Sequence, residues 1–232
     1  RRGRFETAHV PLVDNRSTVP DFRLALREVA AWSDRNPGHV PITLLLELKT
    51  DYAFLDPGLR PIRGSELDAL DTVIRAELGA RLLTPDEVRG GAETLSRAIA
   101  SRGWPRLGAV RGRIVVILHE DETFRKLYVA GHPTLEGRAM FTCAPFDAPD
   151  GGVAICDDPV ADASRIGTAL ARHWIVRTRA DGDGARGQAG LAAALGSGAQ
   201  IVSTDFPPAY PAPDGYVASF AGGKLIEVGQ GR

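Results

Sequence analysis

The segment Pro41-Ile42-Thr43-Leu44-Leu45-Leu46-Glu47-Leu48-Lys49 joins an apolar run to two charged residues at its end. Side chains alternate across a β-strand, so Glu47 and Lys49 should point to the same face. An apolar run of this kind is typical of a parallel strand covered by helices on both sides. In barrels of alternating strands and helices, catalytic groups gather at the carboxyl ends of the strands. We therefore predict a functional site at Glu47 and Lys49; the alternative is a salt bridge that only fills the barrel mouth.

Composition indicates an ordinary globular protein. The chain has 232 residues, of which 44% are hydrophobic and 25% charged, and such a length suits one large α/β domain. The formal net charge is -1 and the basic residues are dispersed, which argues against nucleic acid as a partner. No apolar stretch approaches the roughly 18 residues that cross a bilayer, and no signal-peptide pattern is present. Because the chain opens at Arg1 without a methionine, we expect a processed or truncated product.

Two cysteines, Cys143 and Cys156, are compatible with a disulfide or with two buried thiols, because sequence does not give their separation. The sequence has no close cluster of cysteines and histidines, so a structural zinc site is not expected. No nucleophile elbow, phosphate-cradling glycine loop or metalloprotease motif occurs, which argues against several hydrolase and nucleotide-binding classes.

Apolar runs and helical patterns alternate along the chain. Predicted strands cover 41–48, 113–119, 138–144, 174–180 and 199–204, with further candidates at 4–10 and 216–220. Helical spacing predicts a helix with Pro20 in its first turn that ends near Asn36, a second capped by Ser65, and a third that starts at the capping box Thr84–Glu87 and runs through Ile99. Further helices are expected at 121–128, 160–172 and 185–196.

Strands that alternate with helices predict an α/β fold with parallel pairing and right-handed crossovers. Our first choice is a TIM-type (β/α) barrel, with residues 1–232 as a single domain. A complete barrel typically has about 250 residues and about eight strands, whereas this sequence offers fewer strand candidates. We therefore expect the first one or two strands to lie before Arg1.

Polar residues follow the predicted strands at their carboxyl ends. They are His9, Glu47, Lys49, His119, Glu120, Arg177, Arg179, Asp181 and Asp205. Period-two spacing puts Arg177, Arg179 and Asp181 on one face. Two guanidinium groups facing one space suit a phosphate, because arginine binds phosphate oxygens bidentately. The alternative is an arginine–aspartate network that closes the end of the strand.

The remaining candidate groups differ in how well they are placed. The carboxylate of Glu47 suits a hard cation such as Ca²⁺, but calcium takes about six to eight oxygen ligands. His9 can act as a general acid or base, although a lone histidine commonly packs or faces solvent. His39 leads into the amino end of its strand, away from the expected site. His119 is better placed but has no partner that the sequence identifies.

Four blocks of sequence together resemble one family. The blocks are His9 with 11–15, 31–42 leading into 45–49, 176–181, and 197–207. In this order they resemble the bacterial calcium-dependent phosphatidylinositol-specific phospholipase C family, within the PLC-like phosphodiesterase barrel superfamily. The Trp-Ser-x-x-Asn-Pro-x-His-x-Pro-Ile block, from Trp32 to Ile42, discriminates best, because the strands around Glu47 and Asp205 also resemble glycerophosphodiester phosphodiesterases.

The resemblance implies that the inositol 2-hydroxyl attacks the neighbouring phosphate, expelling diacylglycerol and giving a cyclic inositol phosphate. His9 matches the histidine that protonates the departing glycerol oxygen, and Glu47 matches a ligand of Ca²⁺. Lys49, Arg177 and Arg179 would lie near the phosphate or the inositol hydroxyls. Asp181 and Asp205 would support the mouth of the barrel.

The resemblance also implies partners and a location. The substrate would be phosphatidylinositol or a related phosphodiester, met at a membrane surface by a secreted monomer. Tyr52, Phe54 and Leu55, after Lys49, could dip into a bilayer or pack within their loop. No contact with nucleic acid is expected.

The chain departs from the family at its start. The family's first histidine and a Glu-x-Asp pair that completes the calcium site do not precede His9, so we expect both upstream of Arg1. The chain as given should then bind calcium poorly and not turn over. Two alternatives remain: a glycerophosphodiester phosphodiesterase, and a noncatalytic barrel that binds inositol or a lipid head group, in which replacing His9 would change nothing.

Overall fold

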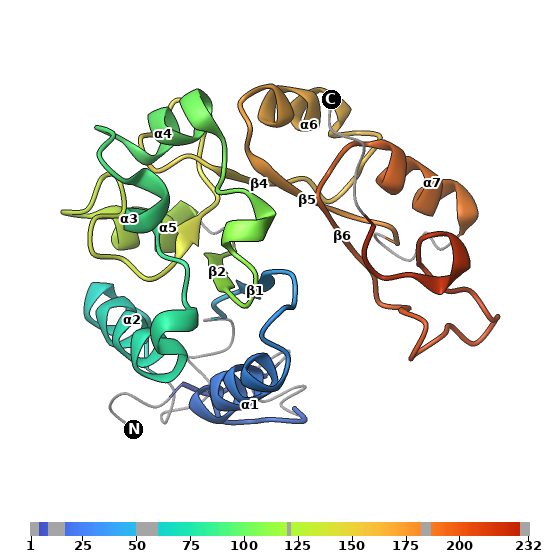
Figure 1. Ribbon diagram of the computed structural model, residues 1–232, viewed down its shortest axis with the longest axis horizontal. Helices are drawn as coiled ribbons and strands as arrows, with labels where there is room; N and C mark the ends of the chain where they lie inside the picture. The colour runs from blue at the N-terminus through green and yellow to red at the C-terminus, as the bar shows by residue number, and fades with distance from the viewer. Residues whose placement is uncertain (1–4, 9–16, 50–59, 120–121, 182–186, 228–232) are drawn as a thin grey trace. The chain divides into compact units, whose positions relative to one another are not determined.

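The computed structural model describes residues 5–8, 17–49, 60–119, 122–181 and 187–227. The chain divides into two compact units, Arg1–Gly152 and Val153–Arg232 (Figure 1). Each unit contains a three-stranded parallel sheet, which confirms the α/β class. Neither three-stranded sheet is by itself a closed barrel. The TIM-type barrel and the single domain over 1–232 therefore stay predictions.

The sheet of the first unit has the order β1, β2, β3. Its strands are β1 (Ile42–Leu46), β2 (Ile114–Leu118) and β3 (Phe141–Thr142). Ile42 lies opposite Ile114 and Leu46 opposite Leu118, and all five residues of β2 are buried. The accompanying helices are α1 (Phe22–Arg35), α2 (Gly64–Leu78), η2 (Gly79–Arg81), α3 (Pro85–Arg89), α4 (Leu95–Arg102), η3 (Leu107–Ala109) and α5 (Glu122–Val129).

The sheet of the second unit has the order β4, β5, β6. Its elements are β4 (Val153–Ile155), α6 (Ala163–Ala171), β5 (Ile175–Arg179), α7 (Gln188–Gly196), β6 (Ile201–Ser203) and η4 (Ala221–Gly223). In Figure 1, α6 and α7 lie along the same side of this sheet. Ala180, which follows β5, packs with Leu191 and Ala194 of α7. Since side chains alternate along β5, Arg177 and Arg179 point to the face away from α7.

None of the helices in the described ranges is long and apolar enough to span a membrane. The two cysteines, Cys143 in the first unit and Cys156 in the second, are both buried, and neither forms a disulfide. Of the two states left open by the sequence, the structure therefore shows thiols.

Helix starts follow their capping residues closely. The side chain of Asp21 accepts hydrogen bonds from the backbone of Arg23 and Leu24, so Pro20 lies just outside α1 and its expected place in the first turn is wrong. Thr84 and Glu87 form the predicted capping box at the start of α3. These local hydrogen bonds are set by neighbouring residues, which is why the sequence indicates them.

The predicted continuous helix from Thr84 through Ile99 is wrong. α3 ends at Gly90, whose φ of +53° is a left-handed conformation that favours glycine. A separate helix, α4, then begins after Thr94, whose hydroxyl accepts a hydrogen bond from Arg97 N at 3.1 Å. The apolar spacing continues through the break because both helices bury one face.

The strand predictions need four corrections. Strand β4 was not predicted, because an apolar run of three residues after two glycines is too short to show a period. Residues 216–220 form no strand; Phe220 makes only an isolated bridge to Lys224. In the described part of the 4–10 candidate, Glu6 likewise makes only an isolated bridge, to Asp21. β3 is shorter than the predicted 138–144.

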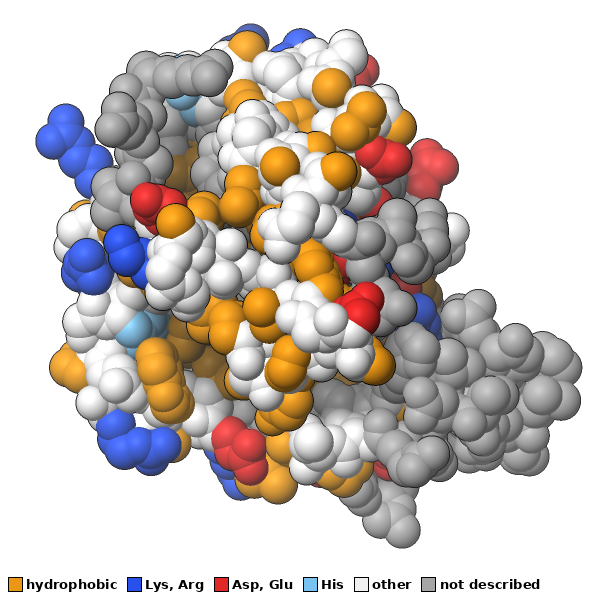
Figure 2. Space-filling model, turned by 90° about the vertical axis from the view of Figure 1, so that its right-hand side faces the viewer, with side chains coloured by type: hydrophobic (Ala, Val, Ile, Leu, Met, Phe, Trp, Pro, Cys, Tyr) orange, Lys and Arg blue, Asp and Glu red, His pale blue; other side chains and the backbone are white. Residues whose placement is uncertain are grey.

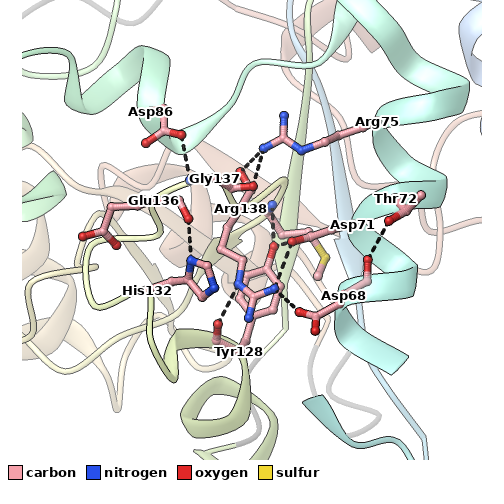
Figure 3. Close-up of polar contacts among 11 residues, drawn as sticks. Asp68, Asp71, Thr72, Arg75, Asp86, Tyr128, His132, Glu136, Gly137 and Arg138 are labelled. Carbon is pink, nitrogen blue, oxygen red and sulfur yellow. Dashed lines mark hydrogen bonds and ion pairs between the residues drawn. The ribbon is translucent and has the colours of Figure 1, made fainter. Parts of the chain in front are cut away.

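A polar network around the buried Arg138 lies just before Phe141, where β3 begins (Figure 3). We call Asp68, Asp71, Tyr128 and Arg138 the Arg138 clasp. The Arg138 guanidinium contacts Asp68 at 2.5 Å and Asp71 at 3.4 Å, and its Nε donates to the Tyr128 carbonyl at 2.9 Å. The Tyr128 hydroxyl donates to Asp71 and accepts from Met140 N. Side-chain bonding to α2 and α5 therefore replaces strand pairing just before β3.

The Trp32 to Ile42 block builds the turn between α1 and β1. Ser33 Oγ lies 2.8 Å from His39 Nε2, and the rings of Trp32 and His39 are 5.3 Å apart. The backbone N–H of Gly112 donates to the His39 carbonyl at 2.9 Å. His39 thus lies at the amino end of β1, as predicted, where it stabilises the fold.

Gly112 gives a test of this turn. Its φ is +73°, and a Cβ there would lie 2.7 Å from the Pro37 carbonyl oxygen. We expect Gly112→Ala to lower the free energy of unfolding by about 1–3 kcal/mol, because both the conformation and the contact strain an alanine. Gly108→Ala, where a Cβ meets no atom within 4 Å, is the matched control in urea denaturation. Equal midpoints for the two variants would contradict the expectation.

Candidate active site

Glu47 and Lys49 form an ion pair just beyond the carboxyl end of β1. Lys49 Nζ lies 2.6 Å from Glu47 Oε1, with side-chain exposures of 29% for Lys49 and 55% for Glu47. This contact confirms that the two side chains share a face of the strand. An exposed carboxylate beside an ammonium can meet both a cation and an anionic ester.

His119 lies beside this pair at the end of β2. Its backbone N–H donates to the Leu46 carbonyl at 2.7 Å, which extends the ladder one step beyond Leu118. By this register, His119 stands next to Glu47 and on the same face. Its Nδ1 is buried and has no hydrogen-bond partner among the described residues.

In the second unit, each arginine of β5 meets an aspartate. Arg177 pairs with Asp157, which follows β4, and Arg179 lies 3.7 Å from Asp205, which follows β6. Both guanidinium groups therefore take part in the arginine–aspartate network that was the alternative to phosphate binding. The Arg179–Asp205 pair is long and the Asp205 side chain is exposed, so an anion can compete with the Asp205 carboxylate for the Arg179 guanidinium.

Asp181 is buried and its carboxylate is used within the protein. It accepts hydrogen bonds from the Thr204 hydroxyl and from Asp205 N, the latter at 3.3 Å. The Tyr216 hydroxyl is buried without a partner in the described part of the chain. Desolvation, together with the charge of Asp181, raises the pKa of Tyr216. These bonds make Asp181 a positioning group for the turn after β6.

Several predicted residues lie outside the described ranges: His9, Tyr52, Phe54, Leu55 and Glu120. Sequence reasoning missed Asp157 and Tyr216. Asp157 could have been found, because two aspartates directly follow the apolar run of β4. Tyr216 gave no such signal, because its environment is created by packing.

The Glu47 carboxylate beyond the end of β1 is the type of ligand that calcium binds. Ca²⁺ takes oxygen ligands, and Glu47 presents a largely exposed carboxylate at the carboxyl end of its strand. Within the described ranges, no three His, Cys, Asp or Glu side chains gather closely enough to hold a metal ion. The described residues therefore contribute Glu47 to such a site.

In each unit, a parallel sheet carries charged groups at the carboxyl ends of its strands, which is typical of an α/β protein with polar sites at such edges. The family model described as phosphoinositide phospholipase C, Ca²⁺-dependent, matches residues 2–229. The chain therefore belongs to the Ca²⁺-dependent phosphoinositide phospholipase C family. This confirms the resemblance inferred from the sequence blocks.

Solved structures share the fold. A calcium-dependent phosphoinositol-specific phospholipase C from Pseudomonas sp. in the apo form has a TM-score of 0.71 and 20% identity, covering 97% of this chain and 78% of that one. A structure of the Pseudomonas enzyme described as a myoinositol complex has a TM-score of 0.67 and 19% identity, with 92% and 73% covered. The enzyme from Streptomyces antibioticus has a TM-score of 0.60 and 20% identity, with 82% and 72% covered. No curated protein matches the chain significantly.

Proposed function

We propose that the intact protein cleaves the glycerol–phosphate ester of phosphatidylinositol and releases diacylglycerol and a cyclic inositol phosphate. The observation that carries this proposal is the Glu47–Lys49 pair at the carboxyl end of β1, in a chain whose family match runs over residues 2–229. The fold likeness supports a TIM-type barrel for the intact protein.

The proposed roles follow the charges. As the inositol 2-hydroxyl oxygen gives its proton to a general base and bonds to phosphorus, the bond to the glycerol oxygen breaks, and His9 gives that oxygen a proton. Lys49, Arg177 and Arg179 offset negative charge on the phosphate oxygens or bind inositol hydroxyls. Glu47 holds calcium, which when bound would activate the attacking hydroxyl and neutralise charge on the phosphate. Asp181 and Asp205 hold the turn after β6 in place.

The product decides the function. Vesicles of phosphatidylinositol are incubated with the intact protein in calcium and, separately, in a calcium chelator, and phosphorus NMR follows the products. We expect a cyclic inositol phosphate only when calcium is present. Glycerol phosphate released from soluble glycerophosphodiesters would instead indicate the related phosphodiesterase. Lipid binding without any product, unchanged by replacing His9, would indicate a noncatalytic barrel.

We also propose that the protein is secreted and acts as a monomer, as the resemblance of its sequence blocks to the family implies. Immunodetection in culture medium tests secretion. Light scattering on the purified protein tests the monomeric state, and a stable dimer would contradict it.

Two exposed apolar residues support contact with a membrane surface. Val160 and Tyr210 are 71% and 75% exposed, and they lie on the loops that leave the carboxyl ends of β4 and β6 in one parallel sheet. Asp158 fixes the first loop, because its carboxylate accepts from Val160 N at 2.8 Å and Ala161 N at 2.9 Å; these backbone bonds lower its pKa. Figure 2 shows apolar side chains interspersed with charged ones on the face that it presents.

A double variant tests this contact. We expect Val160→Ser with Tyr210→Ser to lower activity on lipid vesicles by about tenfold or more, because two apolar contacts with the bilayer are lost. Hydrolysis of a short-chain, soluble phosphatidylinositol should not change. Leu107→Ser, at an exposed apolar residue on η3 before β2, is the control. Equal losses on both substrates would refute the membrane role.

A further inference from the structure

The side chain of His119 is partly buried, and its two ring nitrogens have different surroundings. Nδ1 is buried without a partner in the described part of the chain. Nε2 makes no hydrogen bond to the described residues, yet it is not a buried atom without a partner as Nδ1 is. Nε2 therefore reaches solvent. One end of the imidazole therefore lies in the protein and the other faces outward.

This difference selects a tautomer. A proton on Nδ1 would be a buried N–H donor without an acceptor, which is the costlier kind of unpaired buried group. A lone pair on Nδ1 avoids that cost, so the proton lies on Nε2. The outward nitrogen of His119 is then a hydrogen-bond donor.

The register aims this donor at the candidate site. Leu118 lies opposite Leu46, and His119 N bonds to the Leu46 carbonyl, so the His119 side chain leaves the sheet on the face of Glu47 and Lys49. Those two side chains are joined to each other at 2.6 Å. Nε2 of His119 therefore adds an available neutral donor to the charged pair at this edge.

We propose that His119 is a substrate-binding residue whose Nε2–H donates a hydrogen bond to an oxygen of the inositol phosphate head group. The inference rests on the proposed function. It adds a head-group contact at the end of β2 to the roles already proposed for His9, Glu47 and Lys49. Because the buried Nδ1 side holds the ring in place, the Nε2–H donor has a fixed position. It favours a polyhydroxylated head group over one without an oxygen at that position.

Amide isosteres separate this role from a structural one. The amide nitrogen of glutamine reaches the position of Nε2, whereas that of asparagine reaches the position of Nδ1. We expect His119→Asn and His119→Phe to raise KM for a short-chain soluble phosphatidylinositol about tenfold, the effect of one lost hydrogen bond, and His119→Gln to keep KM within about twofold of the wild-type value. The value of kcat should change less than KM in all three variants.

His173→Asn is the matched control. His173 is exposed at the amino end of β5 with φ of +60°, a conformation that asparagine tolerates, so KM should not change. A purely structural role would lower the thermal midpoint of the His119 variants and leave KM unchanged. Rescue by asparagine instead of glutamine, or an unchanged KM in His119→Phe, would overturn the proposal.

Nitrogen NMR tests the contact without turnover. Long-range proton–nitrogen spectra of the intact protein should show the Nε2–H tautomer at His119, and adding inositol 1-phosphate should shift its Nε2 resonance while His173 stays unchanged. An Nδ1–H tautomer, or no shift at saturating ligand, would refute the inference. If the wild-type protein binds this ligand and shifts His119 but releases no cyclic product, the proposed reaction fails while the head-group contact stands.

Discussion

Arg138→Met is expected to lower the free energy of unfolding by about 3–5 kcal/mol, because it leaves a buried carboxylate without its counter-charge. Asp71 and Arg138 are both buried, and the Arg138 guanidinium lies over the Tyr128 ring at 4.5 Å from its centroid. The variant would leave the Asp71 carboxylate with the Tyr128 hydroxyl but without a cation. Urea denaturation followed by circular dichroism measures the loss.

The loss should depend on pH. Burial raises the pKa of Asp71 above its ordinary value of 3.8, while Tyr128 and Arg138 pull it back down. A raised pKa in the folded state means that protonated Asp71 favours folding at low pH, and this contribution is lost as pH rises through the raised value. Without Arg138 the pKa rises further. The difference in the free energy of unfolding between Arg138→Met and the wild type should therefore grow as pH rises from 3.8 toward neutrality.

Controls distinguish the clasp from a general effect of removing arginine. Arg97→Met removes an exposed arginine that pairs with Glu93 on the surface, and it should cost less than about 1 kcal/mol. Adding Asp71→Asn to Arg138→Met should restore part of the stability, because the unpaired charge is gone. A loss in Arg138→Met that is independent of pH and unaffected by Asp71→Asn would show that the clasp acts only through packing.

Glu47→Gln is expected to lower kcat of the intact protein by about 10²–10³-fold, the scale of losing one electrostatic group at a reacting centre. The substitution keeps the shape of the side chain but removes the charge that pairs with Lys49 at 2.6 Å and would hold calcium. The apparent calcium affinity should fall with it. Activity across a calcium titration and direct calorimetric calcium binding measure the two effects.

The matched control for Glu47→Gln is Glu93→Gln. Glu93 is also exposed and also paired with a basic residue, Arg97, but it lies next to α4. Its substitution should leave kcat and calcium affinity unchanged. Full activity of Glu47→Gln at low calcium would remove Glu47 from the metal site and would leave the Glu47–Lys49 pair with the purely structural role considered from the sequence.

Local signals in the sequence were sufficient for most helices. The buried residues Phe22 and Leu26 of α1, and Leu67, Leu70 and Ile74 of α2, follow the helical period that predicted them. Caps and periods depend on residues a few positions apart, so they can be read without knowing the fold. The break at Gly90 escaped because the apolar period runs through it, and β4 escaped because three residues show no period.

The sequence alone determined the α/β class, the shared face of Glu47 and Lys49, the placing of charged groups after the strands, and the family. The tertiary structure decided which groups meet. Asp157 meets Arg177 across 20 positions and Tyr128 meets Asp71 across 57, while Nδ1 of His119 is left without a partner among the described residues. Such contacts depend on how strands register and helices pack, and no local pattern of residues encodes the distance between two segments far apart in the chain.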